Sequence, residues 1–524
     1  MFRRRRPLAL YLLLLICCNG FAQSFPQNAG RLRFNVSLDA ALSSVPVSGR
    51  LIVFMTDNPK PQQVLEPGFG PGATSVWVAA REVRDLLPGK SVELDPDEIA
   101  FPQPFSHAPT GDYQIMALLD VDHNAAYNTF TNPDLRSAVL RVKALNPAHT
   151  AIVDLKLSDH VPQRPPLHLS DDEKLIDFVS PSLSTFWKFS VHMRGIVVLP
   201  PEYTTAKARY PTVYLTHGFG GYLEGLARMG SRIHQDSVDG KLPPMIWVLL
   251  DESCPGGTHE FADSLNNGPW GTALTTELIP YLEHSYRMDA KPGSRFLTGH
   301  SSGGWATMWL QITYPDVFGG TWSTSPDPVD FRDFTNTDLT KDKNVYARPD
   351  GKATPLVRMG GKDVMSFKEY SRLEVVMGEY GGQMASFDWV FSPQGANGRP
   401  LEMFDRETGE INHAVVEYWL SHYDISHILT ANAKGLVPKL HGKIHIIVGT
   451  ADTFYLDGPV HLLQKSIAPL SYDAKFTYLK GRTHLDLYKG GLQTRIAEQM
   501  YDVARPGNTW RPKVAPDPET ELVK

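Results

Sequence analysis

The pattern of apolar and polar residues changes near residue 160. Before that point, apolar residues alternate with polar ones, as in "RLRFNVSL", where every second residue is apolar. A period of two is typical of a strand with one buried face. Similar runs follow, separated by Gly, Pro and Asn: "GRLIVFMT", "DYQIMALLDV", "SAVLRVKAL" and "TAIVDLKL". Residues 30–160 are therefore predicted to form a small all-β sandwich.

After the proline-rich segment "DHVPQRPPLHL", strand-length apolar runs alternate with helical stretches. The runs are "KFSVHMRGIVVLP", "YPTVYLTHG", "MIWVLLDES", "SRFLTGHS", "GGTWSTSP", "KIHIIVGTAD" and "AKFTYLKG". This alternation predicts a mostly parallel sheet with helices on both faces, the α/β class. Residues 165–510 are predicted to form this domain, and the polar residues 511–524 a disordered tail.

The first 22 residues have the features of an export signal. Four consecutive arginines precede an apolar run from Leu8 to Cys18, and the small residues Gly20 and Ala22 follow. The run is too short to span a bilayer, which takes roughly 20 apolar residues. We therefore expect cleavage after Ala22, a secreted or periplasmic protein, and no membrane attachment after cleavage.

The net charge limits the kinds of partner that we expect, and the cysteine content limits the disulfides. The formal net charge of −6 becomes −6 − 4 = −10 once the signal and its four arginines are removed. Such a charge disfavours nucleic acid and anionic lipid as partners. Of the three cysteines only Cys254 lies outside the signal, so we expect core packing instead of disulfides. Cys254 is expected to be a small buried residue. The oligomeric state stays open.

The stretch "FLTGHSSGGWATMWL" contains a candidate nucleophile, Ser301, between Gly299 and Gly303. A Gly-x-Ser-x-Gly pattern alone is a weak signal, but a strand-like run precedes this one. After it, apolar residues recur at helical spacing: Trp305, Met308, Trp309 and Ile312. In a strand–turn–helix arrangement the turn residue is strained and projects its hydroxyl from the sheet edge. The glycines are expected to let strand and helix approach closely.

A serine hydroxyl needs a base to remove its proton as it attacks. Downstream, Asp452 and His484 each follow a predicted strand, in the order serine, acid, histidine that α/β hydrolases use. We predict His484 as the base and Asp452 as the acid that orients it. Asp457, five residues later, remains the alternative acid. The other histidines considered are poorer bases, because one belongs to the turn and the rest to an inserted region: His300, His413, His422 and His427.

An oxyanion hole is the third requirement of this chemistry. The backbone N–H of Ser302 is one predicted donor. The other is expected from the loop after an earlier strand, and "VYLTHGFGGYLEG" makes Phe219 the candidate.

One motif resembles a calcium-binding loop but lacks two residues that such a loop requires. In "DVDHNAAYN" the residues Asp120, Asp122 and Asn124 have the first three ligand spacings of a calcium loop. The central glycine is absent, and Thr131 stands where a bidentate glutamate belongs. We therefore predict a solvated turn here, and neither a metal nor an organic cofactor for the protein.

Together these residues resemble the esterase family of α/β hydrolases that includes enterochelin esterases, feruloyl and acetylxylan esterases, S-formylglutathione hydrolase and mycolyltransferases. The resemblance rests on "YPTVYLTHGFGG", "MIWVLLDES", "ELIPYLEHSYR", "GHSSGGWATMWLQITYPDVFGG" and "GTADTFYLDG", within residues 185–325 and 443–490. It implies an α/β-hydrolase fold and the triad Ser301, Asp452 and His484, and it places Phe219 at the second oxyanion donor.

Two features depart from that family. The leading β-sandwich resembles an accessory domain found on some enterochelin-type esterases. Residues 330–440 form a long, aromatic-rich insertion between "SPDPVDF" and "KIHIIVG". We expect this insertion to cap the nucleophile and shape its pocket, with a peripheral decoration as the alternative.

The sequence thus predicts a secreted serine carboxylic-ester hydrolase that works through an acyl-enzyme. The expected substrate is a small-molecule or carbohydrate-linked ester, an acyl or aromatic ester of carbohydrate or siderophore. An acyltransferase using the same triad is one alternative. A catalytically silent protein that binds a glycan or a surface is another.

Overall fold

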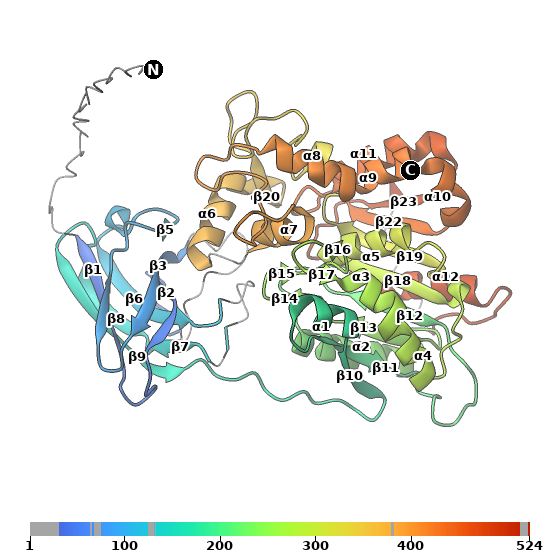
Figure 1. The fold of residues 1–524 in the computed structure, drawn as a ribbon, viewed down its shortest axis with the longest axis horizontal. Helices are drawn as coiled ribbons and strands as arrows, with labels where there is room; N and C mark the ends of the chain where they lie inside the picture. Colours follow the sequence, from blue (N-terminus) through green and yellow to red (C-terminus); the bar gives the residue numbers. More distant parts are fainter. Residues whose placement is uncertain are drawn as a thin grey trace, which may run out of the picture.

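The computed structural model describes residues 31–62, 65, 67, 75–123, 130–131, 133–378, 382–513 and 522–523. The predicted signal, residues 1–22, lies outside them. The N-terminal strands and the large α/β unit lie at opposite ends of the molecule, with part of the inserted segment between them (Figure 1). Among the described residues, no helix has the length and apolar character needed to cross a membrane.

The N-terminal unit is built from one sheet with the strand order β4-β1-β9-β7-β6-β2-β3-β5, and β8 pairs with β6. Only β1 and β9 run parallel. The strands are β1 (Leu32–Leu38), β2 (Val47–Thr56), β3 (Trp77–Leu86), β4 (Ser91–Leu94), β5 (Ala100–Phe101), β6 (Gly111–Asp120), β7 (Leu135–Ser137), β8 (Leu140–Leu145) and β9 (Ala151–His160). The alternation predicted for β1 is confirmed, whereas β3 to β5 were not predicted.

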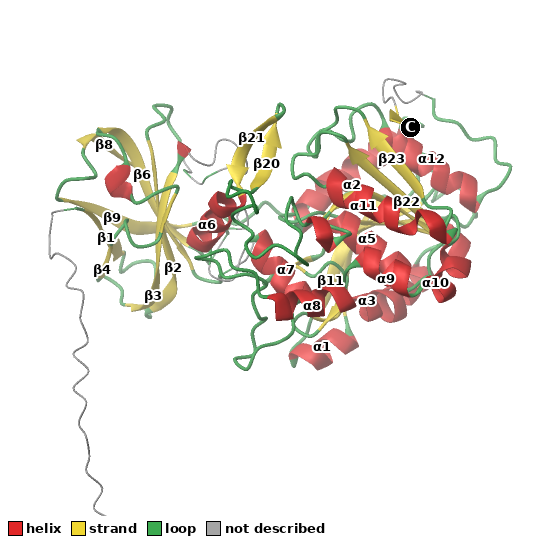
Figure 2. Ribbon diagram, turned by 90° about the horizontal axis from the view of Figure 1, so that it is seen from above, coloured by secondary structure: helices red, strands yellow, loops and turns green. Residues whose placement is uncertain are grey.

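Both faces of the central strands of this unit are buried. Phe34 of β1, Val53 of β2 and Leu157 of β9 share one apolar cluster, so the sheet folds over on itself as a sandwich. The other face of β2 and β6, including Phe54 and Leu118, joins the cluster that contains the inserted segment. Helix α6 (Phe367–Met377) contacts β3 and β5 and lies between the two units (Figure 2). The N-terminal unit is thus docked onto the inserted segment.

The α/β unit is a second nine-stranded sheet with the order β10-β11-β13-β12-β18-β19-β22-β23-β24. Its six central strands are parallel. β11 and β24 run antiparallel to them at the two sides, and β10 pairs antiparallel with β11. The strands are β10 (Glu173–Val179), β11 (His192–Val198), β12 (Thr212–Thr216), β13 (Ile246–Leu250), β18 (Arg295–Ser301), β19 (Gly320–Pro326), β22 (Ile444–Gly449), β23 (Lys475–Leu479) and β24 (Leu522–Val523). This is the α/β-hydrolase arrangement, as predicted.

Helices cover both faces of this sheet because each face is apolar. One face packs against α2 (Leu223–Val238) and α12 (Leu492–Ala504). The other packs against α1 (Pro181–Trp187), α3 (Trp270–Ala273), a π-helical turn, α4 (Ile279–Ser285) and α5 (Ser302–Thr313). Helix α11 (Asp457–Ile467) lies between β22 and the inserted helices.

The inserted segment contains the hairpin β20 (Pro355–Met359) and β21 (Lys362–Ser366) and five helices among its described residues. These are α6, α7 (Gln383–Phe391), α8 (His413–His422), α9 (Ile425–Ala431) and α10 (Ala433–Leu440). Two further hairpins, β14 (Ser253–Cys254) with β15 (Gly257–Thr258) and β16 (Asp263–Ser264) with β17 (Gly268–Pro269), follow β13.

The tail differs from the prediction of disorder at its described residues. Leu522–Val523 forms β24, which pairs with Tyr478 and Leu479 of β23. The backbone N–H of Lys513 donates to the carbonyl oxygen of Gly240 at 3.0 Å. An edge strand such as β23 offers unpaired N–H and C=O groups, so even a polar segment can pair with it.

Candidate active site

Ser301 occupies a strained turn between β18 and α5, which we call the elbow. Its backbone has φ 62° and ψ −127°, a conformation that costs of order 1–3 kcal/mol for a residue with a side chain. A Cβ on Gly299 would lie 2.2 Å from the Gly303 carbonyl oxygen, and a Cβ on Gly303 would lie 2.4 Å from that of His217. The close approach expected of the two glycines is therefore present.

His484 and Asp452 are brought together at the same sheet edge. His484 Nδ1 lies 3.0 Å from Asp452 Oδ2, and the Phe454 N–H donates to the other oxygen at 2.9 Å. Burial acts to raise the pKa of Asp452, but the facing His484 and these hydrogen bonds bring it below its usual value. An ionised Asp452 can thus orient the imidazole and stabilise its charged form.

Asp457, the alternative acid, points elsewhere. Its carboxylate accepts a hydrogen bond from the Arg358 guanidinium at 2.7 Å. Arg358 also donates through Nε to the main-chain oxygen of Asp452 at 2.7 Å. Geometry therefore favours Asp452 as the partner of His484.

The other histidines are placed in ways that do not serve Ser301. The ring of His300 lies 4.3 Å from that of His484, and its Nε2 bonds the His484 carbonyl oxygen at 3.1 Å. Burial, reinforced by His484, lowers the pKa of His300 to about 3, so it stays neutral. On α8 and α9, no hydrogen bond between described residues joins the elbow to His413, His422 or His427.

Asp327 is a residue of the site that the sequence analysis missed. It follows β19, beside the elbow strand, and the Ser301 hydroxyl donates to its Oδ1 at 3.4 Å. The Ser302 hydroxyl donates to Oδ2 at 2.6 Å. Burial raises the pKa of Asp327. Among the described residues Ser301 forms its side-chain hydrogen bond with Asp327, and not with His484.

The loop after β12 packs directly on the elbow. The Gly221 N–H donates to the Gly218 carbonyl oxygen at 3.0 Å, which closes a turn with Phe219 and Gly220 at its centre. Gly220 has a φ of 76°, as the third residue of a type II turn requires. A Cβ on Gly218 would lie 3.0 Å from the Ser301 Cβ, so any larger residue here would press on the nucleophile. The loop thus brings Phe219 to the neighbourhood of the nucleophile.

Ser302, the other predicted donor, is the first residue of α5. N–H groups in the first turn of a helix have no acceptor within that helix. The helix also places its positive dipole end at this position.

The inserted segment reaches the elbow. The side-chain amide of Gln383, at the start of α7, donates to Asp327 Oδ2 at 3.3 Å. Farther along α7, the Ser386 hydroxyl accepts a hydrogen bond from the Thr258 N–H at 2.9 Å. Gln383 and Ser301 therefore contact the same carboxylate.

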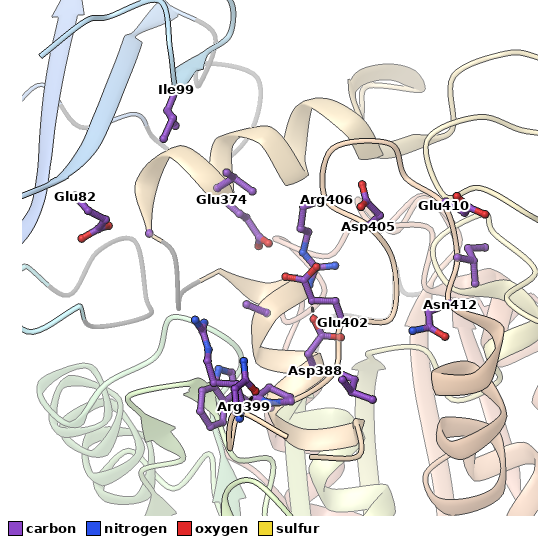
Figure 3. A pocket seen from close by; sticks show the side chains of 18 of the residues that line it. Glu82, Ile99, Glu374, Asp388, Arg399, Glu402, Asp405, Arg406, Glu410 and Asn412 are labelled. Atoms are coloured by element: carbon purple, nitrogen blue, oxygen red, sulfur yellow. Dashed lines mark hydrogen bonds and ion pairs between the residues drawn. The ribbon is translucent and has the colours of Figure 1, made fainter. Parts of the chain in front are cut away.

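A separate cavity of about 1130 Å³ lies between the N-terminal unit and the inserted segment (Figure 3). Its charged residues largely bond one another or the backbone. Arg406 pairs with Asp388, and Arg50 pairs with Glu82. Glu374 accepts the N–H of Met384. These pairs lie within one unit or the other, and Arg50 joins the two units by donating to the carbonyl oxygens of Val376 and Val375.

The failed calcium motif also lies away from the elbow. Asn124 is outside the described residues, but carboxylate oxygens of Asp120, Asp122 and Asp134 lie within 4.8 Å of one another. Burial and neighbouring carboxylates raise the pKa of Asp120 to about 7, and burial raises that of Asp134 to about 6. Both Asp134 oxygens accept backbone N–H groups, at 2.9 and 3.1 Å, which ties the loop together.

Cys254 is only half-buried, although we expected a buried residue. It is unpaired. Burial raises the pKa of its thiol to about 12, which disfavours the reactive thiolate.

The parallel sheet and the elbow between β18 and α5 define an α/β hydrolase. A family model described as "Putative esterase" matches residues 188–491, more than half of the chain. The chain belongs to this family. The N-terminal sandwich lies outside the matched residues.

Two curated relatives are similar over part of this domain. The chain is 31% identical to Esterase Rv1288 of Mycobacterium tuberculosis (strain H37Rv) over 140 residues, 26% of this chain and 30% of that protein. It is 27% identical to the uncharacterized protein YbbA of Bacillus subtilis (strain 168) over 137 residues, 24% of this chain and 53% of YbbA. The matches thus span about half or less of these relatives.

The solved structures to which the chain is similar are more distant. A ferulic acid esterase is 14% identical, with a TM-score of 0.39 over 64% of this chain and 98% of that one. The S-formylglutathione hydrolase FrmB of Staphylococcus aureus is 13% identical, with a TM-score of 0.40 over 64% of this chain and 99% of that one.

Proposed function

We propose that this protein is a secreted serine carboxylic-ester hydrolase with the triad Ser301, His484 and Asp452. The observation that carries the proposal is the 3.0 Å contact of His484 with Asp452 at the sheet edge where Ser301 stands in its strained turn. Membership of the esterase family supports the same reaction class.

In this mechanism His484 takes the proton of the Ser301 hydroxyl as its oxygen attacks the ester carbonyl carbon. The backbone N–H groups of Phe219 and Ser302 stabilise the oxyanion of the tetrahedral intermediate. His484 then gives the proton to the departing alcohol, which leaves the acyl group on Ser301. Water, activated by His484, hydrolyses this acyl-enzyme and releases the acid.

The Ser301 hydroxyl must turn from Asp327 toward His484 before it attacks. The His484 ring lies 4.3 Å from the ring of His300, the residue before Ser301, which places the proposed base beside the turn that carries the nucleophile. Catalytic hydrogen bonds commonly form only when substrate is bound.

The inserted segment is proposed to cap the site. Gln383 bonds the carboxylate that Ser301 contacts, so side chains of α7 are within reach of a bound substrate. The substrate is proposed to be an acyl or aromatic ester of carbohydrate or siderophore, selected by this cap.

The test is labelling of the purified mature protein with a fluorophosphonate, followed by peptide mapping. We expect labelling on Ser301, its loss in Ser301→Ala, and slower labelling in His484→Ala. Folded protein without any label would contradict the proposal and favour a silent binding protein.

Two further measurements complete the test. Product analysis with an added alcohol separates hydrolysis from acyl transfer. N-terminal sequencing of exported protein is expected to begin at Gln23.

A further inference from the structure

Three carboxylates lie around the carboxyl ends of β13, β12, β18 and β19. Glu252 follows β13, Asp327 follows β19, and Glu260 lies in the loop after β13. Their exposed fractions are 0% for Glu252, 0% for Glu260 and 3% for Asp327. Burial raises the pKa of all three, the Asp327 charge further raises that of both glutamates, and the Glu252 charge further raises that of Glu260. Asp327 touches Ser301, so this group of acids borders the nucleophile.

By geometry neither glutamate carboxylate accepts a hydrogen bond, although the nearby Thr258 hydroxyl acts to lower the pKa of Glu260. No described residue donates a hydrogen bond to either carboxylate oxygen of Glu252 or of Glu260. Within the described part of the chain, neither forms an ion pair with a lysine or arginine, and nor does Asp327. Isolated buried carboxyl groups are strongly unfavourable, so a fold that keeps two of them beside its nucleophile needs a reason.

The nearby histidine does not balance these charges. His217 Nε2 lies 3.1 Å from Asp251 Oδ1 and accepts the backbone N–H of Glu252 at 3.0 Å. Its Nδ1 lies 4.0 Å from Glu252 and donates to the Gly218 carbonyl oxygen at 2.8 Å. The acids that act on His217 are Asp251 and Glu252, whereas the charge of His484 acts on Asp327.

The backbone around Glu260 is strained. Glu260 has a φ of 49° and Phe261 a φ of 47°, the left-handed region that side chains avoid. Residues in such conformations gather at functional sites. A shared metal ion does not explain the arrangement. Among the described residues, the only acids and histidines close enough for one ion are Asp120, Asp122 and Asp134.

We infer that Glu252, Glu260 and Asp327 form a recognition site for a positively charged group of the substrate, an ammonium or guanidinium. This inference rests on the proposed function, because it places the cation beside the ester that Ser301 attacks. At Asp327 the cation replaces the neutral amide of Gln383, which donates at 3.3 Å. A charged donor makes a stronger hydrogen bond to a carboxylate than an amide does.

Electrostatics supports a cationic occupant. Burial raises the pKa of Glu252 to about 8 and that of Glu260 well above its usual value. Glu252 therefore holds a proton at neutral pH, and a bound cation releases it by stabilising the carboxylate. The bound cation also offsets the negative charge that the released proton leaves near the oxyanion at Ser301.

The first experiment compares two 4-nitrophenyl esters of matched shape, the 6-aminohexanoate and the heptanoate. We expect kcat/KM to be at least roughly tenfold higher for the aminohexanoate. In Glu252→Gln and Glu260→Gln this preference should fall toward one, with the heptanoate rate changed less. Glu417→Gln, an exposed position on α8, is the control and should keep the preference. Equal rates for both esters in the wild-type protein would contradict the inference.

A binding measurement separates this inference from the proposed function. Calorimetry on Ser301→Ala is expected to show hexylammonium binding at least roughly tenfold tighter than hexan-1-ol, with the difference lost in the two glutamine variants. If the wild-type protein is not labelled by the fluorophosphonate but hexylammonium still binds with this preference, the cation site is supported and the proposed esterase activity is contradicted. If Ser301 is labelled but hexylammonium binds no better than hexan-1-ol, the proposed esterase activity is supported and the cation site is contradicted. A thermal melt of each variant confirms that it is folded.

Discussion

Arg358, from the inserted segment, donates a hydrogen bond through Nε to the main-chain oxygen of Asp452 at 2.7 Å. Its guanidinium also pairs with Asp457 at 2.7 Å and lies 4.5 Å from the centre of the Tyr455 ring. The turn that carries the proposed triad acid is therefore held by a segment outside the parallel sheet. The insertion thus contacts both the turn of the acid, through Arg358, and the carboxylate beside the nucleophile, through Gln383.

Arg358→Lys should lower kcat by about tenfold with little change in KM, because lysine cannot make the forked contacts that position Asp452. Steady-state kinetics on a 4-nitrophenyl ester measures this. Arg372→Lys, at an exposed position on α6, is the matched control and should leave kcat unchanged. A rise in KM alone would mean that Arg358 acts on substrate binding.

Asp452→Asn and Asp457→Asn distinguish the two candidate acids. Asp452→Asn should reduce kcat by about 10³- to 10⁴-fold, because the amide no longer holds the imidazole in the required tautomer. Asp457→Asn should reduce it by less than about tenfold, since this residue only supports Arg358. Comparable losses in both variants would show that the acid is shared between them.

Gly303→Ala tests the packing of the elbow. The added Cβ would meet the carbonyl oxygens of His217 and Thr216 at 2.4 and 2.6 Å, so we expect loss of soluble protein or of fluorophosphonate labelling. Gly435→Ala in α10 is the control, because nothing lies within 4 Å of its Cβ position. That change should raise stability by about 0.5–1 kcal/mol. Normal labelling of Gly303→Ala would contradict the geometry.

Arg50→Met tests the docking of the sandwich on α6. Arg50 is 3% exposed, and its Nε donates to the Val376 carbonyl oxygen at 2.9 Å in the last turn of α6. It also donates to the Val375 carbonyl oxygen. Carbonyl groups left without donors should cost about 1–3 kcal/mol. Calorimetry should then show a lower melting temperature or two separate transitions, whereas Arg84→Met, an exposed control, should melt like the wild type.

Glu252 should make stability depend on pH. Burial first, and then the charges of Asp327 and Asp251, raise its pKa from 4.5 to about 8 against the opposing His217. The folded protein therefore binds this proton more tightly than the unfolded chain does. The stability it contributes is fully present below pH 4.5 and is lost as the pH rises toward about 8, at about 1.4 kcal/mol per pH unit.

Glu252→Gln removes this proton and checks the prediction. The variant should be more stable than the wild type at pH 8, and the difference should shrink at pH 5. Melting curves of both proteins at the two pH values measure it. If the stability difference between the two proteins is the same at pH 5 and pH 8, Glu252 has an ionised partner in solution and the prediction is wrong.

The elbow could be predicted because it depends on local sequence patterns. The strand before Ser301, the helix after it and the two flanking glycines lie within a few residues of one another, and their geometry follows from short-range sterics. The strand ends before Asp452 and His484 were equally visible, because buried parallel strands form continuous apolar runs. Strands β3 to β5 were missed because exposed residues interrupt their apolar pattern or because they are very short.

The amino-acid sequence by itself therefore determined the fold class, the strained serine and the acid and histidine that follow it. Only the tertiary structure decided what surrounds them. It joined Asp327 to Ser301 and Arg358 to Asp452, and it buried the carboxylates of Glu252 and Glu260, neither of which accepts a hydrogen bond by geometry. These relationships connect residues 26 and 94 positions apart, or depend on burial by segments elsewhere in the chain. Periodicity and motif spacing report only neighbours along the chain, whereas charge, desolvation and hydrogen bonding depend on neighbours in space.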